Sequence, residues 1–185
     1  MLIYLGIALF MLFCLFLFSS PRLSPIPYFP TNKKDIPLII KAFELKNNQT
    51  IIDLGAGDGI VIFEAAKNSF LQKLNTEFVA IEINPILILV LHLRRFFHPN
   101  RKNIKIIWGD MFRTDLKDQR SKIKVTTQNS KFITFYIYIS PWLIEKLIKN
   151  LKLKIKNFHV VSYFYEIKNR KPKKILSGQH KVFIY

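Results

Sequence analysis

Short apolar runs alternate with longer segments of mixed polarity along most of this chain. Runs at residues 50–52, 78–81, 104–108 and 132–139 are rich in β-branched and aromatic residues and have the length of buried strands. Helical patterns follow three of them, over residues 60–68, 85–97 and 142–153. This alternation of strand and helix predicts an α/β domain with a mostly parallel sheet and helices on both faces.

The segments on either side of this core complete the predicted domain. Asp35, followed by Ile36 and Pro37, is typical of a helix start with the aspartate as its cap, and that helix would run to about residue 46. Residues 159–165 have the pattern of a fifth buried strand, and residues 174–185 that of a hairpin with Gly178 in its turn. We therefore expect one domain over residues 35–185, closed by an antiparallel hairpin.

Residues 2–18 carry no charge. As a helix they would extend over roughly 26 Å, slightly less than the roughly 30 Å hydrocarbon core of a membrane. A cleaved signal peptide would begin with basic residues and end in a small-residue cleavage site, and the sequence around Met1 and Ser20 has neither feature. The pattern predicts an uncleaved transmembrane helix at residues 1–18 that anchors the protein in a membrane as a single-pass protein.

A proline-rich linker at residues 19–34 would join this anchor to the domain. Arg22, Lys33 and Lys34 follow the apolar segment and no basic side chain precedes it, so the positive-inside rule places the domain in the cytoplasm. The formal net charge of +17 favours anionic partners, either lipid surfaces or nucleic acid. Because the basic residues are scattered, contact with lipid headgroups is the preferred interpretation.

Cysteine and histidine usage narrows the chemistry. The one cysteine, Cys14, lies inside the apolar segment, and the four histidines are scattered without the spacing of metal ligands. The sequence therefore predicts neither a disulfide framework nor a metal site.

The segment DLGAGDG at residues 53–59 directly follows the first strand. Its glycines allow the backbone to approach a ligand closely, and the helix that follows offers backbone N–H groups to an anion. A dinucleotide site would have the spacing G-x-G-x-x-G and would bind a pyrophosphate. Here the spacing is G-x-G-x-G, and Asp53 and Asp58 would repel a pyrophosphate. Two carboxylates suit a ligand with an ammonium group, such as the methionine end of S-adenosylmethionine.

Acidic residues also follow the second and third strands, as Glu82 and Asp110. In open α/β sheets the carboxyl ends of the strands form the ligand-binding edge, and an acid after the second strand typically binds a ribose diol. The predicted cofactor-binding residues are Asp53, Gly55, Ala56, Gly57, Asp58, Gly59, Glu82, Ile83, Asp110 and Met111.

These motifs resemble those of class I S-adenosylmethionine-dependent methyltransferases, whose Rossmann-like sheet usually ends in an antiparallel hairpin. Together with PYFPT at residues 27–31, EINP at 82–85 and YISP at 138–141, they are similar to a group of small protein-lysine methyltransferases. That group includes archaeal broad-specificity enzymes and the mitochondrial enzyme that modifies the c-ring protein of ATP synthase. The resemblance covers roughly residues 26–166, with Ala56 and Ile60 in place of the usual serine and arginine.

The resemblance implies methyl transfer to a lysine amine of a protein, here one associated with a membrane. A lysine with a pKa near 10.4 is neutral in only about 1 part in 2,500 at pH 7, a cost of roughly 4.6 kcal/mol. A dry slot of aromatic side chains would lower that pKa. The residues expected to form the slot and orient the amine are Tyr28, Pro30, Thr31, Ser140, Pro141 and Trp142.

Two alternatives remain from the sequence. Nucleic-acid amino-methyltransferases have a [D/N/S]-P-P-[Y/F/W] motif after the fourth strand, which Ser140-Pro141-Trp142 matches in part. The other alternative is a non-catalytic membrane protein with a degenerate methyltransferase fold. The intact set of Asp53, Glu82, Asp110 and the glycines argues against it.

Overall fold

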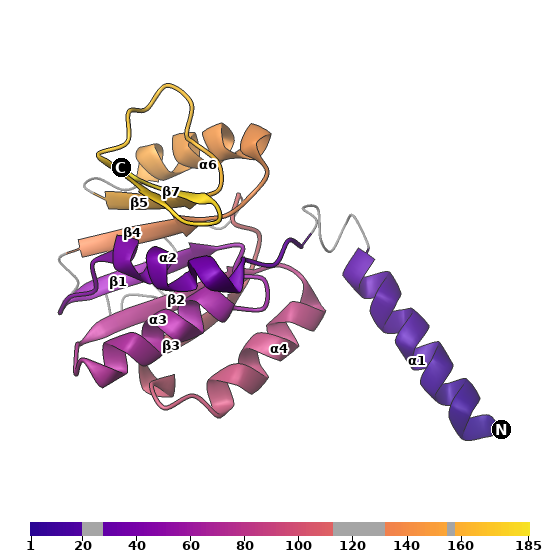
Figure 1. The fold of residues 1–185 in the computed structure, drawn as a ribbon. Coiled ribbons are helices and arrows are strands. Elements are labelled where there is room, and N and C mark those ends of the chain that lie inside the picture. Colours follow the sequence, from indigo (N-terminus) through magenta and orange to yellow (C-terminus); the bar gives the residue numbers. More distant parts are fainter. Residues whose placement is uncertain (20–27, 113–131, 155–157) are drawn as a thin grey trace.

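A seven-stranded sheet forms the centre of the molecule in the computed structural model, which describes residues 1–19, 28–112, 132–154 and 158–185 (Figure 1). The strand order is β3-β2-β1-β4-β5-β7-β6. The strands are β1 (Gln49–Leu54), β2 (Thr76–Glu82), β3 (Ile104–Trp108), β4 (Phe132–Ile137), β5 (Phe158–Tyr163), β6 (Lys174–Ser177) and β7 (Lys181–Ile184).

The first five strands are parallel, and β7 runs antiparallel to both β5 and β6. The predicted mostly parallel sheet with a closing hairpin is therefore confirmed. Successive strands leave β1 on one side towards β2 and β3, and on the other towards β4 and β5. The strand order thus reverses between β1 and β4, and a crevice at the carboxyl ends of these strands is the usual ligand site of such sheets.

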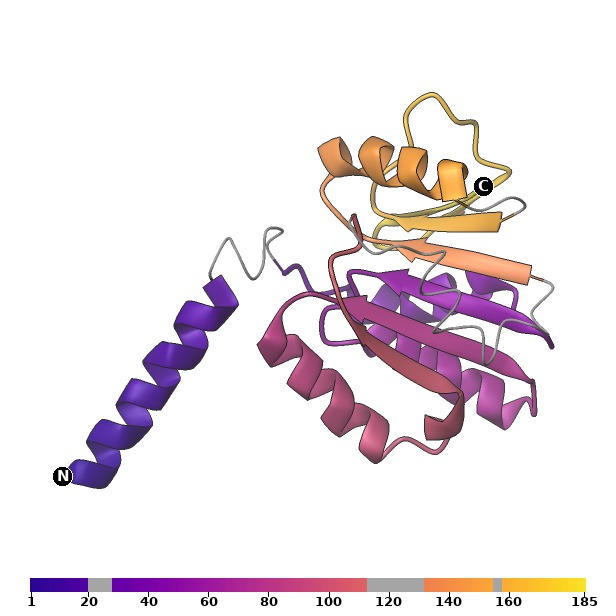
Figure 2. The ribbon, with the colours of Figure 1, turned by 180° about the vertical axis from the view of Figure 1, so that it is seen from behind.

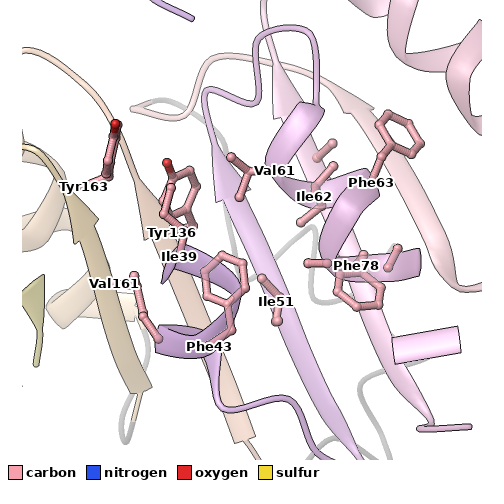
Figure 3. Packing of buried hydrophobic residues seen from close by; sticks show 14 of the residues in the cluster. Ile39, Phe43, Ile51, Val61, Ile62, Phe63, Phe78, Tyr136, Val161 and Tyr163 are labelled. Carbon is pink, nitrogen blue, oxygen red and sulfur yellow. The ribbon is translucent and has the colours of Figure 1, made fainter. Parts of the chain in front are cut away.

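Helices cover both faces of the sheet, as predicted (Figure 2). On one face α2 (Ile36–Phe43), α3 (Ile60–Leu71) and α4 (Pro85–Phe96) pack on a core that Figure 3 shows in part. On the other face α6 (Pro141–Lys154) packs on residues that include Phe135 and Ile137. Short 3₁₀ turns, η1 (Lys33–Asp35) and η2 (Arg101–Asn103), precede α2 and β3. Helix α2 ends earlier than predicted because Glu44 adopts a left-handed conformation, with φ of 48°.

The apolar N-terminal segment forms one helix, α1 (Leu2–Ser19), which projects from the rest of the molecule (Figures 1 and 2). Its 18 residues extend over about 27 Å. Within the described part of the chain, no helix combines the length and the apolar character that crossing a membrane requires. The structure thus does not support the predicted membrane-spanning anchor at residues 1–18. Most of the predicted linker, residues 20–27, lies outside the described residues.

Asp35 does not cap α2, contrary to the sequence prediction. Its buried carboxylate instead accepts hydrogen bonds from the backbone N–H groups of Gln179 (2.7 Å) and His180 (2.9 Å), and from the hydroxyl of Tyr163 (2.8 Å). The His180 Nδ1 atom lies 3.2 Å from the same carboxylate. Gly178 is required in the hairpin turn because a Cβ atom there would overlap the Asp35 carboxylate. These contacts fasten the start of α2 to the C-terminal hairpin.

The Asp35 contacts predict a pH-dependent contribution to stability. Burial by itself raises the pKa of this carboxyl, but the hydrogen bonds from Tyr163, Gln179 and His180 outweigh it and lower the pKa below its usual value. We expect Asp35→Asn to lower the free energy of unfolding by about 2–3 kcal/mol in urea at pH 7, because a buried charged acceptor is lost. Glu166→Gln makes the same change on an exposed side chain and is the control.

The same difference between wild type and variant should shrink in acid. An aspartate with a lowered folded-state pKa stabilises fully above its unfolded pKa of about 4, and this stabilisation is lost as the pH falls through the folded value. An equal loss of stability in Asp35→Asn at pH 7 and in strong acid would contradict the role assigned to the Asp35 charge.

Candidate functional site

A cavity of about 790 Å³, its open mouth included, lies at the carboxyl ends of β1, β2, β3 and β4. This volume is in the range of small-molecule sites. Its walls come from the ends of these strands, the start of α3 and the segment before η1. The lining residues are Tyr28, Phe29, Thr31, Asp53, Gly55, Ala56, Gly57, Asp58, Ile60, Val61, Ile81, Glu82, Ile83, Leu87, Gly109, Asp110, Met111, Phe112, Tyr136, Tyr138 and Ile139.

The Glu82 carboxylate, 7% exposed, holds two turns of the cavity in place. One oxygen accepts a hydrogen bond from the Gly57 backbone N–H at 2.8 Å. The other accepts from the N–H groups of Ile83 (2.8 Å) and Asn84 (2.9 Å), at the turn into α4. Since Glu82 ends β2 and Gly57 follows β1, this side chain fixes the glycine-rich turn relative to the neighbouring strand.

The residues 28–31, which we call the wall segment, lie over the glycine-rich turn. Gly57 has φ of 58°, and a Cβ atom there would lie 2.7 Å from the ring of Tyr28. The Tyr28 hydroxyl donates a hydrogen bond to Asp58, and burial together with the negative charge of Asp58 raises the pKa of Tyr28 to about 12. Tyr28 is therefore neutral at physiological pH and covers the turn as an aromatic lid.

Asp58 is bound on three sides by the protein itself. One oxygen accepts a hydrogen bond from the Ile60 N–H at 3.1 Å, which places a carboxylate at the N-terminus of α3. The other oxygen lies 2.9 Å from the Arg94 guanidinium of α4. An anionic ligand at this helix start would meet the Asp58 charge, so the turn is not built for a pyrophosphate.

Asp53 differs from Glu82 and Asp58 in having no described hydrogen-bond donor. Only 3% exposed, it ends β1, and burial, followed by repulsion from Glu82 and Asp58, raises its pKa well above the usual value. A positively charged ligand group beside this carboxylate would offset both effects.

Tyr136 of β4 is the register partner of Asp53 on the adjacent strand. Its buried hydroxyl lies beside the Thr31 side chain but has no hydrogen bond with a described residue. Figure 3 shows this hydroxyl pointing towards the carboxyl ends of the strands, where the cavity lies. Burial and the nearby Asp53 raise the pKa of Tyr136, so the hydroxyl stays neutral. An unpaired buried hydroxyl and an unpaired carboxylate therefore lie side by side.

The third acid, Asp110, ends the strand at the far side of the cavity. Its carboxylate accepts a hydrogen bond from the Phe112 N–H at 2.8 Å, which shapes the turn after β3. The neighbouring Met111 packs its methyl group against Gly55, where a Cβ atom would lie 2.7 Å from it.

Most of the predicted site residues lie around this one cavity. It is lined by Tyr28, Thr31, Asp53, Gly55, Ala56, Gly57, Asp58, Glu82, Ile83, Asp110 and Met111. The others, Pro30, Gly59, Ser140, Pro141 and Trp142, do not line it. Trp142 is 77% exposed because it lies in the first turn of α6 and faces away from the protein. Gly59 instead leaves room for the side chains of Phe63 and Leu91. The binding roles of all these residues remain predictions.

The sequence analysis missed Tyr136, Ile139 and Phe112 as cavity residues. Strand periodicity held a signal for Tyr136, since side chains two apart on a strand share a face and Tyr138 was expected near the site. Phe112 follows the third strand end and had no such signal.

Comparisons with known proteins agree with this geometry. The family model described as ribosomal RNA adenine dimethylase matches residues 28–165. A protein-lysine N-methyltransferase of Saccharolobus islandicus (strain REY15A) is 26% identical over 172 residues, which cover 86% of this chain and 92% of that protein. An ATP synthase lysine N-methyltransferase of Caenorhabditis elegans, named for the C-subunit, is 26% identical over 104 residues. That second match spans about half of each protein, 53% of this chain and 52% of the other.

Solved structures share the fold. An RNA methyltransferase from Salinibacter ruber, in complex with S-adenosyl-L-homocysteine, aligns with a TM-score of 0.67 at 20% identity, over 85% of this chain and 92% of that chain. A SAM-dependent methyltransferase from Geobacter sulfurreducens, in the same kind of complex, aligns with a TM-score of 0.53 at 14% identity, over 79% and 56%.

The unpaired Asp53 predicts that stability is given up for binding. With a raised folded-state pKa, this carboxyl lowers the stability of the fold as the pH rises from about 4 through that folded value. We therefore expect Asp53→Asn to unfold at a higher urea concentration than wild type at pH 7, with the difference vanishing below about pH 4. Glu82→Gln is the contrasting variant, expected to destabilise because it weakens three hydrogen bonds. A less stable Asp53→Asn would show that the Asp53 charge has a partner in the folded protein.

Proposed function

The chain belongs to the ribosomal RNA adenine dimethylase family and is an S-adenosylmethionine-dependent methyltransferase, and we propose that it methylates the side-chain amine of a lysine in a protein. The observation that carries this proposal is the tyrosine-lined end of the cavity, where the unpaired hydroxyl of Tyr136 lies beside Asp53. The similarity to two protein-lysine N-methyltransferases supports it. The resemblance seen in the sequence, to class I methyltransferases and to this group, is thus confirmed.

The residues of the cavity fit the cofactor. We assign Asp53 to its ammonium group, because the carboxylate is buried, lies near two other acids and has no described cationic partner. Glu82 would accept hydrogen bonds from the ribose hydroxyls, and Asp110 from the adenine amine. When bound, the cofactor supplies an electrophilic sulfonium methyl group, and its leaving thioether is neutral and needs no general acid.

The protein's own task is to hold a neutral amine in line with that methyl group. Tyr28, Tyr136 and Tyr138 provide a slot of aromatic rings in which the charged form of a lysine is disfavoured. The Tyr136 hydroxyl is placed to accept a hydrogen bond from the amine, which orients the amine lone pair. Positioning and exclusion of water then account for most of the rate enhancement.

The wall segment completes this slot. Tyr28 packs on Gly57 and donates to Asp58, while Thr31 lies beside the Tyr136 hydroxyl. The same segment carries the PYFPT sequence that resembles the lysine-methylating group. A membrane-associated protein as the substrate remains part of the proposal, and it rests on the exposed apolar side chains of α1.

A nucleic acid is the second candidate acceptor. The matching family model is named for an RNA-modifying activity, and the formal net charge of +17 suits a polyanion. Against it, Ser140, Pro141 and Trp142, which match the nucleic-acid motif in part, do not line the cavity.

Transfer of labelled methyl groups decides between the acceptors. Full-length protein and labelled S-adenosylmethionine are added to a membrane extract, and the label is followed through protease or nuclease digestion and acid hydrolysis. We expect protease-sensitive label that elutes as methyllysine. The Glu82→Ala variant is the control, expected to lose transfer together with about 1–3 kcal/mol of cofactor affinity. Methylated bases without methyllysine would replace the lysine proposal with the nucleic-acid one.

Thr31 should act on turnover more than on cofactor binding. We expect Thr31→Ala to lower kcat about tenfold, or 1.4 kcal/mol in activation free energy, with little change in cofactor affinity by calorimetry. The reason is that Thr31 lies beside Tyr136, where the acceptor amine is expected. Ser177→Ala on the exposed strand β6 is the matched control. A parallel loss of turnover and cofactor affinity would move Thr31 to the cofactor side of the cavity.

A further inference from the structure

Helix α4 is apolar on both its inner and its outer side. Its inner side chains, which include Leu87 and Leu91, are buried against the sheet. On the outer side Leu89, Leu93 and Phe96 recur at helical spacing and are 58%, 55% and 65% exposed. A helix on the surface of a globular protein normally carries polar residues on this side. The outer side of α4 therefore calls for a partner.

This apolar stripe continues beyond the helix. Phe97, 80% exposed, packs edge-on against Phe96 at the end of α4. Both border a shallow depression that Phe70 of α3 also lines, and Leu71 lies next to Phe70 at 69% exposure. We call this continuous surface the α4 surface, and it consists of Phe70, Leu71, Leu89, Leu93, Phe96 and Phe97.

Basic side chains border the α4 surface. Arg95, Arg101 and Lys102 line one depression together with Leu89 and Leu93, and Lys73 lies beside Leu71. The Arg95 guanidinium is fixed by a hydrogen bond to the carbonyl of Arg101 at 3.2 Å. Residues 85–103 contain four arginines and lysines and no aspartate or glutamate. The border is therefore positive, and no acid within this stretch neutralises it.

We propose that the α4 surface docks on an anionic membrane, with its apolar side chains at the boundary between headgroups and acyl chains. An exposed apolar stripe bordered by arginine and lysine is the pattern of helices that lie in the membrane interface. The basic border would contact lipid phosphates, each close contact contributing about 1 kcal/mol. A second copy of the chain is a poor occupant, because association would bring two positive borders together.

The position of α1 supports the same occupant. This helix has no charged side chain, and its apolar side chains are exposed along its length. It comes close to α4, and Figure 1 shows its C-terminal end directed towards that side of the domain. Two exposed apolar elements therefore lie on one side of the protein. The proposal concerns adsorption on a membrane surface, and it holds whether the acceptor is a lysine or a nucleic acid.

Binding of the full chain to lipid vesicles tests the proposal. Vesicles of phosphatidylcholine alone are compared with vesicles that also contain phosphatidylglycerol. Because α1 carries no charged side chain, its contribution is expected to be similar for both, and the preference for anionic vesicles reports the α4 surface. We expect about tenfold tighter binding to the anionic vesicles, with the preference falling as salt is added.

Two double variants locate the binding. Leu93→Ser with Phe97→Ser removes apolar contacts, and Arg101→Glu with Lys102→Glu reverses charge. Each should weaken binding to anionic vesicles about tenfold. The matched controls lie on the other side of the sheet near β6, namely Phe164→Ser with Ile175→Ser and Lys171→Glu with Lys174→Glu, all exposed. They should stay within about twofold of wild type.

Several outcomes would overturn the proposal. One is equal binding to neutral and anionic vesicles by the wild type. Another is an equal loss in the Lys171 and Lys174 control, which would make the attraction a matter of net charge. If the α4 variants left vesicle binding unchanged but weakened binding to a structured RNA, the surface would be a nucleic-acid surface. If they abolished a concentration-dependent dimer, it would be a contact between copies.

Discussion

The Glu82 carboxylate is the point on which the architecture of the site depends. It joins the turn after β1, through Gly57, to the turn between β2 and α4, through Ile83 and Asn84. Once Gly57 is fixed in this way, the Tyr28 ring has a flat backbone surface to pack on, and Asp58 is presented to Arg94. The wall segment, the glycine-rich turn and α4 therefore share one anchor, although they lie far apart in the sequence.

The acids around the cavity fall into two kinds. Glu82 and Asp58 are saturated by backbone and side-chain donors, so their charges belong to the structure of the site. Asp53 is left without a described donor, and its raised pKa reflects the cost of keeping a bare carboxylate in the interior. Sites that bind a charged ligand commonly keep one group in this state, and the ligand then supplies the missing interaction.

The sequence was informative wherever the relevant contacts are local. Apolar runs and the glycine at position 178 were enough to predict the strands and the hairpin, and acids after three strands identified the binding edge. Prediction failed where a distant partner decides the outcome. Asp35 has the local signature of a helix cap, yet its carboxylate binds a hairpin about 145 residues away. Ser140 and Trp142 share a motif-like stretch, but the orientation of α6 turns Trp142 outwards.

The link between Asp35 and the hairpin also sets an order in which the protein becomes competent during synthesis. The wall segment is made early, but its anchor at Gln179 and His180 leaves the ribosome only near the end of translation. Until then the start of α2 has no partner for its buried carboxylate, and the wall beside Thr31 lacks its support. A nascent chain that already contains the whole glycine-rich turn is thus still without a finished acceptor slot. Folding of this enzyme is completed from its two ends, through a contact of high sequence separation that forms late.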